Sequence, residues 1–497
     1  MRQALHIFKK DVRYLRYEIA LVLLIAGVFA AMHARASHGL SDSWWAQLAL
    51  VVASAFLIGR LVLAEAIPGD RQFWITRPYR WRSLLGAKLL FIVVFVNLPL
   101  ALAHLFILAV EGFPLVSNLA GLFWTQFLLF TLVSLPFAAL AALNSGIVPF
   151  IFSQLIVLAA VFSVQELLPP LPRWLDGVEW VPASLALFFL GATAVTVLLV
   201  QYKSRRILFS RWYALGGIAA AVLVFAAMPW PVALAVQSHL SRQPSLGSSI
   251  TIAAGEISGQ PNGLPYLVAR AKPGALYLPI LMQGIPNGTE IQADAVTASL
   301  EAPDGHKARV SATDCPDLRR LTTSVNSAMI STTCFPDPVF LSRERDRPLT
   351  LHASLYFTLF GNARSQTIPL SDQPSNAPDG LQCYTDSVRA EWDVYCQSAF
   401  RWPARLVYAK LGHTSANSFA QFVSYSPFPA ELGIEPIETR WASAYASGPS
   451  PTVRDVTIMV EEPLEHLRRD FQASGVRLDE FAYPPDKVGP VPIQAIP

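Results

Sequence analysis

Long apolar runs alternate with short polar segments over the first half of the chain. A helix needs about 20 mostly apolar residues to cross the hydrocarbon core of a bilayer. Because every backbone polar group must be hydrogen-bonded internally there, such runs are predicted to be helices and not strands. Seven runs have this length, at about 18–34, 44–66, 87–110, 119–142, 147–166, 183–201 and 213–236. The pattern therefore predicts a helical transmembrane domain of about seven spans over residues 18–236.

After residue 240 the pattern changes to short alternating stretches separated by Gly, Pro, Asn and Asp. From Leu349 to Phe357 every second residue is apolar, which is the period of a half-buried strand. Many short strands between turn residues favour a β-sandwich. Residues 240–497 are therefore predicted to form an all-β, sandwich-like domain. A short helix is expected after Pro463, where three apolar residues share one helical face.

Composition supports a membrane protein. The chain has 497 residues, of which 53% are hydrophobic and 15% are charged. Soluble domains carry roughly a quarter of charged residues. The net charge of +3 is too small to suggest a nucleic acid as a partner. The position of the charges along the chain is more informative than their sum.

The distribution of Lys and Arg predicts the orientation, because loops rich in these residues stay in the cytoplasm. They gather before the first span, between the second and third, and after the sixth: Arg2, Lys9, Lys10, Arg13, Arg16, Arg71, Arg77, Arg80, Arg82, Lys88, Lys203, Arg205, Arg206 and Arg211. The opposite loops carry Arg35 and Arg173. The N-terminus is therefore expected in the cytoplasm of a bacterium. Seven crossings of the inner membrane would then place residues 240–497 in the periplasm or outside the cell.

The first span admits a second interpretation. Ala34-Arg35-Ala36 resembles the small-residue cleavage site of a signal peptide. The long charged segment before the span and the length of the apolar run argue against cleavage. Removal of this segment would not change the sidedness of the later loops.

All four cysteines follow residue 240: Cys315, Cys334, Cys383 and Cys396. An even number in one domain agrees with an oxidising compartment, where disulfides form. Proximity in the sequence favours the pairs Cys315–Cys334 and Cys383–Cys396, one of three possible connectivities. The alternative is free buried thiols. No Cys/His spacing indicates a metal site, and no cofactor is predicted.

Residues 1–17 are predicted to form a cytoplasmic amphipathic helix. Leu5, Phe8, Val12 and Leu15 fall on one helical stripe, and cationic residues occupy the rest of the surface. A basic amphipathic helix of this kind lies at the interface of an anionic inner leaflet. The alternative is a positively charged segment that only fixes the topology.

The segment between the second and third predicted spans is rich in aromatic and cationic residues. Thr76 precedes an Arg-Pro pair, so the chain is expected to be extended or turned before Pro78. Pro78 can then begin a short helix that leads into the third span. Such an elbow exposes its side chains to a cytoplasmic partner. In the alternative interpretation, Trp74, Tyr79 and Trp81 are interfacial belt residues and the arginines fix the topology.

The order of an amphipathic helix, two spans and a Phe-Trp-x-Thr-Arg-Pro segment ending in Lys resembles the permeases of type 2 ABC transporters, the ABC-2 class. The resemblance covers residues 1 to about 210, and Phe73 to Lys88 is its most specific part. In that family this stretch is similar to the element that docks on the ATPase. The resemblance implies a coupling role for Asp70, Arg71, Phe73, Trp74, Thr76, Arg77, Pro78 and Lys88. The family commonly has six spans with both termini inside, whereas a seventh span and an outer domain are predicted here.

The chain contains no G-x-x-x-x-G-K-[ST] motif, so an ATPase is expected on a separate subunit, with a homodimer or a second permease as a further partner. No catalytic motif was found, and the chain is not expected to be an enzyme. One alternative is a membrane-anchored binding or signalling module outside the cytoplasm. Another is an intramembrane enzyme using His104 and Ser145. The sparse polar residues of the spans are interpreted as helix-packing residues: Arg60, with Glu65 near it along the helix, Asn97, His104 and Gln126.

Overall fold

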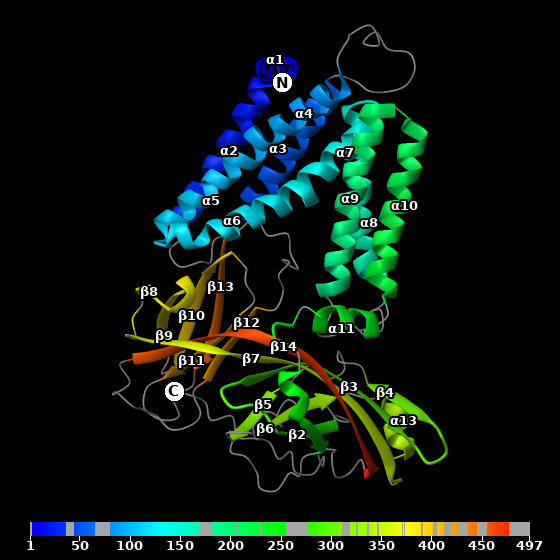
Figure 1. The fold of residues 1–497 in the computed structure, drawn as a ribbon, viewed down its shortest axis with the longest axis vertical. Helices are drawn as coiled ribbons and strands as arrows, with labels where there is room; N and C mark the ends of the chain where they lie inside the picture. Colours follow the sequence, from blue (N-terminus) through cyan, green and yellow to red (C-terminus); the bar gives the residue numbers. More distant parts are fainter. Residues whose placement is uncertain are drawn as a thin grey trace. The chain divides into compact units, whose positions relative to one another are not determined.

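The computed structural model has a helical N-terminal half and a β-rich C-terminal half (Figure 1). It describes residues 2–35, 44–64, 80–167, 180–204, 206–228, 230–239, 241–243, 245–254, 276–310, 319–324, 327–334, 337–344, 347–369, 371, 373–388, 391–400, 405–411, 419–424, 436–444 and 455–476. The chain forms two compact units: Met1–Pro169, Pro182–Met228 and Arg364–Val460 make the first, and Pro170–Val181, Pro229–Ala363 and Glu461–Pro497 make the second.

Helices occupy most of the described chain before residue 240. They are α1 (Arg2–Tyr14), α2 (Arg16–Arg35), α3 (Trp44–Leu63), α4 (Trp81–Ile92), α5 (Leu98–Val110), α6 (Leu115–Leu129), α7 (Leu135–Leu143), α8 (Ile147–Leu167), α9 (Trp180–Ser204), α10 (Ile207–Ala227) and α11 (Trp230–His239). Two π-helical turns, η2 (Val93–Asn97) and η3 (Phe130–Ser134), join α4 to α5 and α6 to α7. Each of these pairs is therefore one long interrupted helix.

Six helical segments of the described chain are long and apolar enough to cross a membrane: Arg16–His33, Trp45–Leu63, Trp81–Val110, Leu115–Leu143, Val181–Ser204 and Ile207–Phe225. The predicted run 147–166 is helical in α8, of which Ile147–Val157 counts as a shorter apolar helix. A seventh span stays a prediction. The predicted run 213–236 is divided between α10 and α11. Met228 is extended there, as expected for a residue before a proline.

The helices of the first unit share one apolar core. Helix α2 packs against α3 and α5, α1 against α4, and α3 against α7. Phe29, Phe91 and Phe150 are among its fully buried side chains. Large apolar side chains are also exposed on the outer faces, including Leu24 and Phe123. Apolar residues on both faces of a helix are typical of a membrane span, so the helical region is membrane-embedded.

The described residues of the β-rich half form three sheets. Their strand orders are β1-β2-β6-β5, β13-β10-β9-β8 and β12-β11-β14-β7-β3-β4. The strands are β1 (Thr251–Ala254), β2 (Leu276–Gln283), β3 (Glu290–Glu301), β4 (Lys307–Val310), β5 (Arg319–Ser324), β6 (Ser327–Cys334), β7 (Leu349–Pro369), β8 (Ser375–Asn376), β9 (Gln382–Val388), β10 (Glu391–Ala399), β11 (Arg405–Leu411), β12 (Phe419–Ser424), β13 (Ile437–Ala444) and β14 (Asp455–Val476). The β-rich character is confirmed, and the sandwich arrangement stays a prediction.

Strand β7 confirms the predicted alternation. Leu349, Leu351 and Ala353 are buried, and the residues between them are partly exposed. The helix expected after Pro463 is wrong, because β14 continues through this position to Val476. Leu467 and Phe471 are four residues apart, a spacing that also fits one face of a strand. Pairing within the sheet determines the conformation here.

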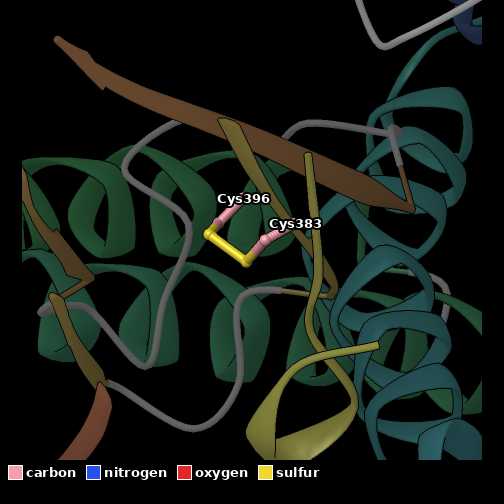
Figure 2. Close-up of a disulfide and its surroundings, with 2 residues drawn as sticks. All are labelled: Cys383 and Cys396. Carbon is pink, nitrogen blue, oxygen red and sulfur yellow. A yellow bond between two sulfur atoms is a disulfide. The ribbon is translucent and has the colours of Figure 1, made fainter. Parts of the chain in front are cut away.

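Strands β9 and β10 are joined by a disulfide between Cys383 and Cys396 (Figure 2). The two residues face each other in the antiparallel register, and both side chains are buried. This predicted pair is confirmed. Cys315 lies outside the described residues, so the pair Cys315–Cys334 stays a prediction.

Candidate functional site

The third membrane span carries a line of buried charged, aromatic and polar side chains. It extends from Trp81 to Val110 through α4, the π-helical turn η2 and α5. Lys88, Asn97 and His104 are its buried polar residues. We take the side chains of this helix and their partners as the candidate functional site, because buried polar groups inside a membrane mark functional positions by default.

A buried ion pair joins α4 to α1 at the start of this span. The Nζ atom of Lys88 lies 2.8 Å from the Oδ2 atom of Asp11, and both side chains are 2% exposed. Removing two charges from water is costly unless they are paired with good geometry. The pair therefore fixes the position of α1 against α4.

The ion pair also determines which face of α1 is buried. Ile7, Asp11 and Leu15 are almost fully buried, whereas Leu5 is 49% exposed. The predicted stripe of Leu5, Phe8, Val12 and Leu15 is therefore rotated from the observed one. The pattern of apolar residues alone could not predict this buried face, because Asp11 counts as polar. The informative signal is the spacing of Ile7, Asp11 and Leu15, in which an acidic residue lies four positions from an apolar residue on each side.

Aromatic side chains extend the contact between α1 and the third span. The rings of Phe8 and Phe95 are stacked with centroids 5.8 Å apart, and Phe91 meets both rings. Aromatic pairs of this kind add about 0.5–1.5 kcal/mol beyond their buried area. The contacts of α1 therefore extend about two turns along the third span beyond Lys88, as far as Phe95.

Arg60 in α3 finds its partner on a neighbouring helix. Its Nε atom lies 3.4 Å from the Oε1 atom of Glu18 in α2, and its guanidinium lies over the ring of Tyr14. Glu65, which was expected to assist Arg60, lies outside the described residues. The observed contact connects the beginning of α2 with the end of α3.

The third and fourth spans contain a similar short sequence, Val-polar-Leu-Pro, at their π-helical turns. Val96-Asn97-Leu98-Pro99 recurs as Val133-Ser134-Leu135-Pro136. In each span the leucine N–H bonds to a carbonyl five residues back, Val93 or Phe130. A proline has no N–H to donate, and its ring crowds the preceding turn. The widened turn before each proline accommodates this, and such π-bulges occur frequently at functional sites.

The two π-helical turns meet through their polar residues. The Ser134 hydroxyl donates to the Oδ1 atom of Asn97 at 3.5 Å, and the Asn97 amide donates to the Gln126 carbonyl at 3.5 Å. About two turns beyond Asn97, the Gln126 amide lies 3.3 Å from the Nδ1 atom of His104, which is fully buried. Asn97, His104 and Gln126 were predicted to be helix-packing residues, and the structure brings them together, with Ser134, between two helices. The repeated polar-Leu-Pro triplet could have indicated this.

Most of the predicted coupling residues fall in a part of the chain without a described structure. Asp70, Arg71, Phe73, Trp74, Thr76, Arg77 and Pro78 lie outside the described residues. Lys88 lies in α4 and is buried against Asp11. A coupling role for these residues stays a prediction, and a role for Lys88 would act through α1.

Among the described residues, no group of three or more His, Cys, Asp or Glu side chains is placed to hold a metal ion. No protein-family model matches this chain, and no curated protein matches it either.

Proposed function

We propose that the chain is the membrane-spanning permease subunit of an ATP-driven, ABC-type transporter that works with a separate cytoplasmic ATPase. The observation that carries the proposal is the buried Asp11–Lys88 pair at the start of the third span. Helix α4 begins at Trp81, within the predicted 70–88 elbow. Displacement of the elbow by an ATPase would therefore move α4 and, through the ion pair, α1.

The π-helical turns η2 and η3 are the positions at which this movement would bend the membrane helices. A helix bends most easily at a proline or a π-bulge, and the third and fourth spans contain both. Their contact through Asn97 and Ser134 makes the two bends adjacent. Movement arriving along α4 would thus shift both spans together. In the proposed transporter, these two spans open and close the pathway.

Within the second unit, the segment that follows α11 is hydrogen-bonded to β14. The carboxylate of Glu465 in β14 accepts hydrogen bonds from the N–H groups of Ser245 and Gly247, both at 2.7 Å. The Arg469 guanidinium donates to the carbonyls of Gly247 and Ile250. The segment that follows α11 is thus fixed to the sheet. In the proposed transporter, movement of α11 is carried into the outer domain.

The test is co-purification in mild detergent from the native host. The tagged chain is expected to recover an ATPase that contains a phosphate-binding loop. The variant Trp74→Ala/Arg77→Ala is expected to lose it. The control Trp212→Ala/Arg206→Ala, at exposed positions in α10 and at its N-cap, is expected to keep it. Failure of every form to recover an ATPase would overturn the proposal. Equal recovery by both variants would overturn the role of the elbow.

The second candidate is a membrane-anchored recognition module without transport activity. It is favoured by the buried cores of the β-rich half, including the one around Ile280, Val296 and Leu355, and by the disulfide. In this case the domain would act when its helical half is replaced by one anchoring span. The transporter proposal expects such a chimera to be inactive.

A further inference from the structure

The buried pair gives α1 an exposed face that carries positive charges and no acid. Residues of a helix advance by about 100° each, so Arg2, Lys9 and Arg13 lie within about 20° of the side opposite Asp11. All three are exposed. Asp11 is the one acidic residue of the sequence between residues 2 and 16. Its burial against Lys88 removes the negative charge from this surface.

An apolar flank borders the cationic face. Leu5 is 49% exposed, and Val12 and Phe8 are partly exposed between the cations and the buried stripe. A helix with apolar residues next to cations lies at the membrane surface, with the apolar residues among the acyl chains and the cations near the headgroups. A soluble acidic protein would not require this exposed apolar flank.

The position of α1 in the chain places it at a membrane surface. Helix α2, a candidate span, begins at Arg16, and the helical hydrogen bonds continue across the junction from Leu15 to Asp11 and from Ile19 to Leu15. The exposed Arg16 guanidinium lies 4.6 Å from the centroid of the Tyr17 ring. Arginine and tyrosine are both enriched at the end of a span, where headgroups begin.

We propose that the face formed by Arg2, Lys9, Arg13 and Arg16, with its flank of Leu5 and Val12, binds the phosphate groups of anionic phospholipids. The cations pair with headgroup phosphates, and the flank holds the helix at the level where those phosphates lie. The site is independent of transport activity. It exists in this form because the Asp11–Lys88 pair fixes the rotation of the helix.

The test measures binding of phosphatidylglycerol and phosphatidylcholine with the same acyl chains to the purified full chain, by native mass spectrometry. The wild type is expected to bind phosphatidylglycerol more tightly. Each cation near a charged surface contributes about fivefold in affinity, so Lys9→Gln/Arg13→Gln is expected to lose most of the preference. The matched control Lys307→Gln/Arg309→Gln removes two exposed cations from β4 and is expected to keep it.

Three outcomes would overturn the proposal. The wild type could bind both lipids equally, or both double variants could lose the preference to the same extent, which would indicate an effect of net charge. In the third outcome, the α1 variant keeps its lipids but loses a co-purifying acidic protein, which would assign the face to a protein partner. Unchanged elution of each variant on size exclusion shows that it is folded.

Discussion

Lys88 in α4 and Asp11 in α1, which are 77 residues apart in the sequence, form an ion pair at 2.8 Å. Each side chain is 2% exposed, so neither charge is shielded by water. Attraction between the two charges offsets the cost of burying them, and either charge alone would be strongly unfavourable. Loss of either residue alone therefore destabilises the α1–α4 contact, because it leaves the other charge buried without a partner.

Replacing Lys88 alone is expected to destabilise the protein. In Lys88→Met the Asp11 carboxylate stays buried without its partner, at a cost of about 3–5 kcal/mol. Thermal unfolding in detergent would show this as a lower Tm. The control Lys9→Met changes an exposed cation of α1 and should alter the free energy of unfolding by about 0.5 kcal/mol or less.

The double variant Asp11→Leu/Lys88→Met separates loss of charge from loss of packing. Apolar residues of similar volume in place of a buried pair are neutral or stabilising. Its Tm is therefore expected near that of the wild type. A double variant as unstable as Lys88→Met would contradict the account of the pair.

Gly59 in α3 provides a test of the contact with α8. A Cβ atom at this position would lie 2.3 Å from Cε1 of Phe150, whose side chain is buried. Gly59→Ala is expected to cost about 1–3 kcal/mol through overpacking. Gly27→Ala in α2 is the matched control, because its Cβ would meet nothing within 4 Å. This control should be neutral or slightly stabilising, since alanine favours helix formation. Equal effects on Tm would show that α3 and α8 do not pack closely here.

The Cys383–Cys396 disulfide closes a loop with a sequence separation of 13. Cross-linking a loop of this size stabilises a protein by about 3 kcal/mol, because it restricts the unfolded chain. Cys383→Ser/Cys396→Ser is expected to lower the free energy of unfolding of the β-rich half by this amount. Mass spectrometry after alkylation without reductant should find both wild-type cysteines unmodified. Alkylation at either position would contradict the assigned pair.

His466 in β14 predicts a dependence of stability on pH. Burial lowers the pKa of its imidazole from 6.5 to about 4, and the ring lies 2.8 Å from the Thr358 hydroxyl. Below pH 6.5 the unfolded chain binds a proton that the folded chain does not bind until about pH 4. Stability should therefore fall by about 3 kcal/mol as the pH decreases from 6.5 to 4.

Denaturant titrations of wild type and His466→Gln at several pH values would measure this dependence. The slope between pH 6.5 and 4.5 is expected to be smaller in the variant. The pKa values of Glu301 and Asp304 are lowered by the hydrogen bonds from Lys307 and from the His306 N–H, respectively. The stability that these carboxylates add is present above pH 4.5 and is lost only at lower pH. An identical slope in the variant would assign the effect to other groups.

Hydrophobic patterning predicts the membrane helices well, because length and apolar content are the main requirements for a span. The sequence of α2, α3 and α9 meets them directly. It cannot predict which polar residues meet across helices, because Asp11 and Lys88 are brought together by the tertiary packing of α1 and α4. Their partnership leaves no local pattern in the chain.

The β-rich half shows the same division between local and tertiary signals. The period of two in β7 identifies this strand without a structure. Leu464, Leu467 and Phe471 fit a helix by spacing, yet they lie in β14 because its neighbours β7 and β11 pair with it in the sheet. The role of Glu465 could not have been predicted from the sequence. The N–H groups that donate hydrogen bonds to its carboxylate belong to residues about 220 positions earlier.

The proposed transporter requires α1 and the β-rich half to lie on opposite sides of the membrane, and sided cysteine labelling tests this most directly. Single cysteines are introduced at the exposed positions Lys9 and Val339, and intact cells receive a membrane-impermeant maleimide, with the unmodified chain as the background. We expect Val339→Cys to react in intact cells and Lys9→Cys to react only after permeabilisation. Labelling of both positions in intact cells, or of neither, would contradict the account.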